Sequence, residues 1–285
     1  MKILMIYPPS VFRATMKYCL ANWRDLTRLM VIPVILSSLF NAFAGARFAK
    51  IMEEFFNQTG QNEVVSLADS LRIFTQHMMG DWVIWISFML SLYMQIAFMR
   101  AVIINIIAPK RRYIQSFFWP NQSLLLFFGV LLMILLLVCL PGSILATIFL
   151  QKGQSVGAVF IFFLGFVLSA FYLFARLSPS LVAAAKGDWL NPLEAFQISK
   201  IKGYVQAIIT IIFAAMMASL VGQSVVSGVM ANGAVMLNSE HGLTSLSYNL
   251  IASLGGNIIS YMALLPVMVA IASLFRTIHS IDHVV

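Results

Sequence analysis

The 285 residues are 61% hydrophobic and 10% charged, and their mean hydropathy is +0.92. An ordinary soluble domain carries about 25% charged residues, so this chain has too few polar groups to cover a surface that faces water. The formal charge of +8 would suit a nucleic-acid partner, but the basic residues flank apolar segments and no nucleic-acid-binding motif accompanies them. No nucleic-acid partner is therefore expected.

The first predicted element is an amphipathic helix over residues 10–28. Its basic face carries Arg13, Lys17, Arg24 and Arg28, which we expect to contact the headgroups of anionic lipids. Its apolar face is formed by Phe12, Met16, Cys19, Leu20 and Trp23. A helix divided in this way lies in the membrane interface, where it either anchors the first span or senses the lipid composition.

Six apolar segments are each near or above the ~20 residues that a helix needs to cross the hydrocarbon core of a bilayer. They are residues 29–45, 82–107, 124–150, 156–176, 205–230 and 250–275. No polar block of domain size separates them, so the sequence predicts one membrane domain over residues 1–285. The predicted fold class is all-α, a polytopic bundle of about six transmembrane helices.

The distribution of Lys and Arg predicts the orientation of the bundle. All but four of the 18 Lys and Arg fall on the same side as the N-terminus if the spans alternate in direction. The four exceptions are Arg47, Lys50, Arg72 and Lys152. Because cytoplasmic loops carry the excess of basic residues, we expect both termini in the cytoplasm.

Two further helical elements are predicted outside the spans. Residues 46–81 have apolar side chains near helical spacing on both sides of Gly60, which predicts an outer helical hairpin. Residues 192–202 predict a short amphipathic helix on the cytoplasmic side, because Asn191 is a typical N-cap and Pro192 a typical first residue. Its apolar residues, which we expect to dock a partner, are Leu193, Phe196 and Ile201.

Small residues recur at every fourth position in the last two predicted spans. They are Ala214, Ala218 and Gly222 in the fifth span and Ala252, Gly256 and Ser260 in the sixth. Small side chains at this spacing allow two helix backbones to approach closely. We expect these faces to pack against each other or against a partner helix.

Groups suited to catalysis or ion coupling are scarce. No Asp or Glu falls within the six predicted spans, although ion-coupled transporters keep ionisable groups there. Arg100 lies well inside a span, and we expect its long side chain to reach lipid headgroups, with a partner contact as the alternative. His279 and His283 lack the further ligands of a metal site. No catalytic residue, metal or cofactor is expected.

Four short stretches resemble the YciC-like proteins, a family of bacterial inner-membrane proteins with six predicted spans. The stretches are SVFRAT at 10–15, LPG at 140–142, ARLSP at 175–179 and PLEAFQIS at 192–199. The resemblance implies a multi-pass protein of a bacterial inner membrane. It implies no particular activity.

Two functions follow as hypotheses. The first is a non-enzymatic scaffold or accessory subunit of an envelope assembly that handles lipids or export, with another membrane or envelope protein as partner. The second is a permease-like subunit that docks a cytoplasmic ATPase through residues 192–202. The stretch AAAKGD at 183–188 lacks the glutamate of the conserved loop of importer permeases, which weakens the second hypothesis.

Overall fold

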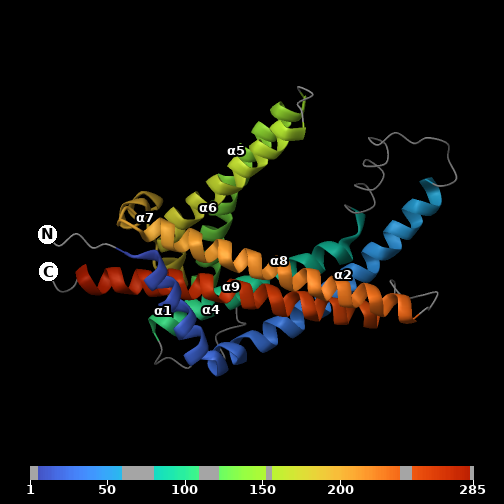
Figure 1. Ribbon diagram of the computed structural model, residues 1–285, viewed down its shortest axis with the longest axis horizontal. Coiled ribbons are helices and arrows are strands. Elements are labelled where there is room, and N and C mark those ends of the chain that lie inside the picture. The colour runs from blue at the N-terminus through green and yellow to red at the C-terminus, as the bar shows by residue number, and fades with distance from the viewer. Residues whose placement is uncertain (1–5, 60–79, 109–121, 152–155, 238–245, 283–285) are drawn as a thin grey trace. The chain divides into compact units, whose positions relative to one another are not determined.

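The computed structural model describes residues 6–59, 80–108, 122–151, 156–237 and 246–282, and these residues form α-helices and no strand (Figure 1). The helices are α1 (Pro8–Ala21), α2 (Trp23–Thr59), α4 (Trp82–Ile107), α5 (Gln122–Gln151), α6 (Val156–Lys186), α7 (Pro192–Ile198), α8 (Tyr204–Leu237) and α9 (Leu246–Asp282). The predicted all-α class is confirmed.

Five of the described helices are long and apolar enough to cross a membrane. The apolar stretches are Trp23–Ile51, Trp82–Ile107, Ile161–Lys186, Tyr204–Val229 and Tyr248–Ile278. The shortest have 26 residues, or about 39 Å at 1.5 Å per residue, which exceeds the ~30 Å hydrocarbon core. Large apolar side chains on them are exposed, among them Ile161 at 71% and Phe163 at 62%. This is a multi-pass α-helical membrane protein.

The third predicted span, residues 124–150, corresponds to α5, which runs over 30 residues from Gln122 to Gln151 and is not among these five. Its apolar part with described side chains is Gln122–Leu137, which is shorter than a full span. The helix continues through Pro141, as α6 continues through Pro179 and α9 through Pro266. Proline is tolerated in membrane helices where other donors satisfy the freed carbonyl.

Several predicted boundaries differ from the structure. The first helix ends at Ala21, and Trp23 already begins the long helix α2, so the predicted range 10–28 spans a break at Asn22. α2 then continues to Thr59, so the first arm of the predicted outer hairpin is an extension of the span. Residues 60–79, which include the rest of that hairpin, lie outside the described residues. Only α4 matches its predicted range, 82–107, at both ends.

Contacts divide the chain into two compact units. Unit 1 comprises residues 1–26, 99–216 and 264–285, and unit 2 comprises residues 27–98 and 217–263. In unit 1, α6 packs against both α5 and α7, and its core includes Leu181, Ile208 and Val269. In unit 2, Phe98 and Tyr261 are fully buried, with their rings edge to face at a centroid distance of 5.0 Å.

Candidate functional site

The helix α7 lies between α6 and α8 and begins where the sequence predicts. The side chain of Asn191 accepts a hydrogen bond from the Leu193 N–H at 3.0 Å, Pro192 follows the cap, and Glu194 lies in the first turn. A cap of this kind satisfies an N–H that has no partner within the helix. The cap therefore favours a helix over Pro192–Ile198, although this helix has only seven residues.

α7 ends at Ile198, so the predicted range 192–202 is too long. The hydroxyl of Ser199 donates to the Phe196 carbonyl at 3.1 Å, and the backbone then turns. The Lys202 carbonyl accepts the N–H of Ile6 at 2.9 Å, and Gly203 adopts a φ of 87°. Because Lys202 pairs with the segment before α1, residues 200–202 cannot continue the helix.

α7 is held against α6 at both ends. Arg176 on α6 donates from Nη1 to the Ser199 carbonyl at 2.8 Å and from Nε to the Tyr172 hydroxyl at 3.0 Å. At the other end, the Ser180 hydroxyl donates to the Leu190 carbonyl at 3.4 Å. Ala195 and Ser199 are buried. Since α6 supplies these donors, the orientation of α7 relative to α6 is well defined.

The buried hydroxyl groups of Ser178 and Tyr204 form a hydrogen-bonded chain that stabilises α6. Pro179 has no N–H, so the carbonyl of Ala175 loses its usual helical partner. The Ser178 hydroxyl donates to that carbonyl at 2.8 Å, and Tyr204 Oη lies 2.9 Å from Ser178 Oγ. Because the single serine proton is used on Ala175, Tyr204 is the donor to Ser178. The sequence signal for this arrangement is the Ser-Pro pair, and no local pattern links that pair to Tyr204.

The exposed residues of α7 and of the segment just before it are apolar and acidic. Leu193 is 72% exposed and Trp189 is 61% exposed, whereas Phe196 and Ile201 are half-buried. Of the three predicted docking residues, Leu193 is thus the most accessible, and Trp189 was not among them. We call Asp188, Trp189, Leu193 and Glu194, which are all exposed, the α7 patch.

The predicted lipid-contacting residues of the N-terminal region are exposed. They are Arg13, Lys17, Arg24 and Arg28, the first two on α1 and the others on α2. Of the predicted apolar face, Met16, Leu20 and Trp23 are exposed, but Phe12 and Cys19 are half-buried against the protein. Burial raises the pKa of the Cys19 thiol to about 11.

Arg100 is placed differently from the prediction. Its residue exposure is 6%, and its guanidinium donates from Nη2 to the hydroxyl of Ser123 at the start of α5. The side chain therefore points into the protein, and the expected contact with lipid headgroups does not match this position. The guanidinium links α4 to α5 through this hydrogen bond, which offsets part of the cost of burying the charge.

The predicted small-residue faces are only partly used. Within unit 2, a Cβ at Gly222 on α8 would lie 2.9 Å from Ile259 on α9, and one at Gly255 would lie 3.0 Å from Val226. A Cβ at Gly256 would meet nothing within 4 Å, so the contact on α9 lies one residue earlier than predicted. Ala218 is exposed, Ala214 and Ala252 are half-buried, and Ser260 accepts from Gln223 at 3.4 Å.

A polar seam connects α2 and α9 within unit 2. Ser37 Oγ lies 2.7 Å from Tyr261 Oη, Asn41 donates to Asn257 at 3.2 Å, and Asn257 donates to Ser38 at 3.1 Å. Hydrogen bonds of this kind hold helices together in lipid. Ser37 and Asn41 on α2, and Asn257 and Tyr261 on α9, recur at i, i+4, which is the sequence signal for the seam.

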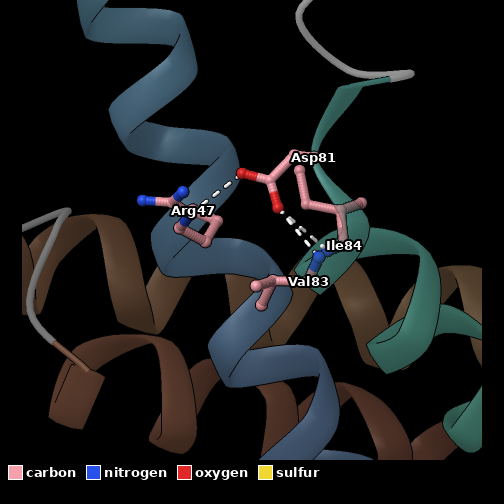
Figure 2. A network of polar contacts seen from close by, with 4 residues as sticks. All are labelled: Arg47, Asp81, Val83 and Ile84. Atoms are coloured by element: carbon pink, nitrogen blue, oxygen red, sulfur yellow. Dashed lines mark hydrogen bonds and ion pairs between the residues drawn. The ribbon is translucent and has the colours of Figure 1, made fainter.

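An ion pair joins the beginning of α4 to α2 (Figure 2). Arg47 Nε lies 2.9 Å from Asp81 Oδ2, and the other carboxylate oxygen accepts the N–H groups of Val83 and Ile84 at 3.0 and 3.3 Å. Asp81 thereby caps α4, and a carboxylate is favourable at this end of a helix. The role of this ion pair is structural, because it joins α2 to the start of α4.

Groups for catalysis or metal binding are not gathered in the part of the chain that the structure describes. No set of three His, Cys, Asp or Glu residues in these ranges is placed to hold a metal ion. His283 lies outside the described residues, so it stays a prediction that His279 and His283 form no metal site. The described geometry thus offers surfaces and helix contacts, and the α7 patch is its most distinct exposed feature.

The fold and these surfaces define an α-helical multi-pass membrane protein. No protein-family model, curated protein or solved structure matches the chain.

Proposed function

We propose that this protein is a non-enzymatic component of a bacterial inner membrane, as its resemblance to the YciC-like proteins suggests. In this proposal it is a scaffold or accessory subunit of an envelope assembly that handles lipids or export. Its cytoplasmic face holds a partner protein through the α7 patch. The observation that carries the proposal is the 72% exposure of Leu193 on a helix whose other side is anchored to α6.

The α7 patch favours a protein partner over a lipid surface. Asp188 and Glu194 flank Trp189 and Leu193, and carboxylates are repelled by anionic headgroups. Trp is enriched among the residues that dominate protein interfaces, and the exposed Leu193 adds apolar surface four residues away along the chain. Lys186, the nearest preceding cation, has its ammonium 5.6 Å from the ring centroid of Phe275. We therefore expect a partner with an apolar pocket flanked by basic side chains.

Photo-crosslinking in native membranes tests the proposal. A benzophenone amino acid at position 193 is expected to capture one protein that the same probe at the exposed position 206 does not capture. Leu193→Asp is expected to remove that protein from the purified complex, and Gln206→Ala is the matched control that should retain it. Retention of the protein by Leu193→Asp would overturn the assignment of the α7 patch.

The nature of the captured protein distinguishes the two hypotheses. A partner without nucleotide hydrolysis supports the scaffold. A partner whose ATP hydrolysis depends on Leu193 would favour the permease-like subunit instead. Turnover of a phospholipid by the purified protein alone would overturn the non-enzymatic assignment.

A further inference from the structure

The helix α1 and the start of α2 present an apolar stripe that is open to the surroundings. Met16, Leu20 and Trp23 are 39%, 70% and 57% exposed. Met16 and Leu20 are four residues apart on one face of α1, and Trp23 follows the break at Asn22 as the first residue of α2. Thr15 on α1 and Leu26 on α2 are buried, and both belong to unit 1. Met16, Leu20 and Trp23, which we call the stripe, thus stay exposed in a segment that also has buried residues.

Basic side chains accompany the stripe. Arg13, Lys17 and Arg24 are exposed. Helical spacing places Arg13 and Lys17 beside Met16 and Leu20 on α1, and Arg24 follows Trp23 at the start of α2. The Arg24 guanidinium lies 5.9 Å from the ring centroid of Trp23. Asp25 is the one carboxylate in residues 6–28. This combination complements an anionic phospholipid surface, in contrast to the acidic α7 patch.

The beginning of this segment is connected to the end of α7. The N–H of Ile6 donates to the Lys202 carbonyl at 2.9 Å. Gly203, the next residue, has a φ of 87°, and a Cβ there would lie only 1.8 Å from the Ile6 carbonyl oxygen. Only glycine fits this contact, which we call the Ile6–Lys202 bridge. Three residues before Lys202, the Ser199 carbonyl accepts from Arg176, so the bridge joins α1 to the anchored end of α7.

We propose that α1 binds anionic phospholipid through this stripe and its cations, and that the Ile6–Lys202 bridge transmits this binding to α7, so that the membrane regulates the docking site. The proposal rests on the proposed function for its biological meaning. Its two physical steps can be measured without the partner. Coupling of this kind is reciprocal, so a partner on α7 also strengthens lipid binding by α1.

Hydrogen exchange of the full chain in nanodiscs measures both steps. The comparison is between phosphatidylcholine alone and an equal mixture of phosphatidylcholine and phosphatidylglycerol. The anionic lipid is expected to slow amide exchange in both α1 and α7 by about fivefold or more, the lower end of typical coupling between sites. The combined variant Arg13→Gln, Lys17→Gln and Arg24→Gln is expected to lose the response in both helices.

Gly203→Ala separates the two steps. The added Cβ breaks the bridge, so α1 should still respond to phosphatidylglycerol while the response of α7 is lost. Gly187→Ala is the matched control, since Gly187 also has a positive φ, of 100°, and its Cβ would meet only Ser123 at 3.4 Å. It should keep both responses.

A second variant guards against misfolding of Gly203→Ala. Ile6→Pro removes the donated N–H without adding an atom at position 203, and it should give the same result. Equal exchange of α1 in the two lipid compositions would overturn the assignment of the stripe as a surface that binds anionic lipid. A persistent response of α7 in both bridge variants would overturn the coupling. Neither measurement involves position 193. Failure of the coupling can therefore be distinguished from failure to find the proposed partner at Leu193.

Discussion

Cys19 lies on α1 and is half-buried, so its thiol is in a less polar environment than water. This desolvation disfavours the thiolate, which raises the pKa to about 11 from an ordinary value of 9.0. The thiolate is the reactive form, so at pH 8 about one molecule in a thousand is reactive, compared with about one in ten at the ordinary pKa.

The expected result is that maleimide labels Cys19 roughly 100-fold more slowly in the native protein than after denaturation in SDS. The native rate should rise about tenfold per pH unit until the pH approaches the raised pKa. Cys139→Ser leaves a single thiol for the measurement by mass spectrometry. Native labelling at the denatured rate would contradict the described burial.

Ser178 replaces the hydrogen bond that Pro179 removes from Ala175. Ser178→Ala would leave that buried carbonyl and the Tyr204 hydroxyl without Ser178, so we expect a loss of about 1–3 kcal/mol in the free energy of unfolding. Ser169→Ala is the control, because Ser169 is exposed and donates to the Gly165 carbonyl on the same helix. SDS-driven unfolding should separate the two variants, and equal midpoints would count against the buried chain.

At the scale of helices, α8 and α9 approach each other closely at Gly222. Gly222→Val would force side-chain atoms against Ile259, and overpacking of this kind costs about 1–3 kcal/mol. Gly256→Val is the matched control, with no atom within 4 Å of its Cβ, and we expect about 0.5 kcal/mol or less. The measurement is the thermal midpoint in detergent. An equal loss in both variants would instead fit the spacing predicted from sequence.

The polar seam between α2 and α9 gives a second prediction at this scale. Asn257 is 6% exposed and bonds to both Asn41 and Ser38. Asn257→Leu should lower the free energy of unfolding by about 1–2 kcal/mol, since hydrogen bonds between membrane helices contribute about 0.6 kcal/mol on average and up to about 1.7 kcal/mol.

Gln223→Leu provides the comparison for Asn257→Leu. Gln223 is exposed and its contacts with Ser219 and Ser260 are both 3.4 Å long, so its replacement should have little effect. SDS titration of the two variants measures the difference. A seam variant as stable as the unchanged protein would show that packing alone joins α2 to α9.

At the scale of the whole molecule, the number of crossings decides the topology. We expect six, with α5 as the third and both termini in the cytoplasm. In a protein without its own cysteines, Lys152→Cys should react with a membrane-impermeant maleimide from outside the cell. Lys200→Cys should react only after permeabilisation. Labelling of both positions from the same side would contradict this topology.

The apolar spans and the start of α7 could be predicted because they depend on neighbours along the chain. Residues 82–107 form an uninterrupted apolar helix, and Asn191 caps α7 through an N–H only two residues away. Hydropathy and capping are local, so no knowledge of the fold is required. The exposure of Arg13 and Lys17 follows in the same way from helical spacing.

Positions that depend on distant partners were predicted poorly. Gly256 and Gly255 differ by one residue, yet the register of α9 against α8 decides that Gly255 faces Val226. Arg100 carries a charge that would suit headgroups, but Ser123 on another helix accepts its hydrogen bond inside the protein. The small-residue pattern and the charge alone do not specify which face of a helix is buried.

The apolar composition and the periodicity of the chain by themselves determined that this is an all-α membrane protein, because lipid admits few other ways to satisfy a spanning backbone. The tertiary structure alone decided how the amphipathic elements are connected. The Ile6 N–H and the Lys202 carbonyl are far apart in the sequence, and their pairing needs the turn at Gly203 and the attachment of α7 to α6. No local pattern encodes such a contact, since its free energy comes from elements that meet only in the folded chain.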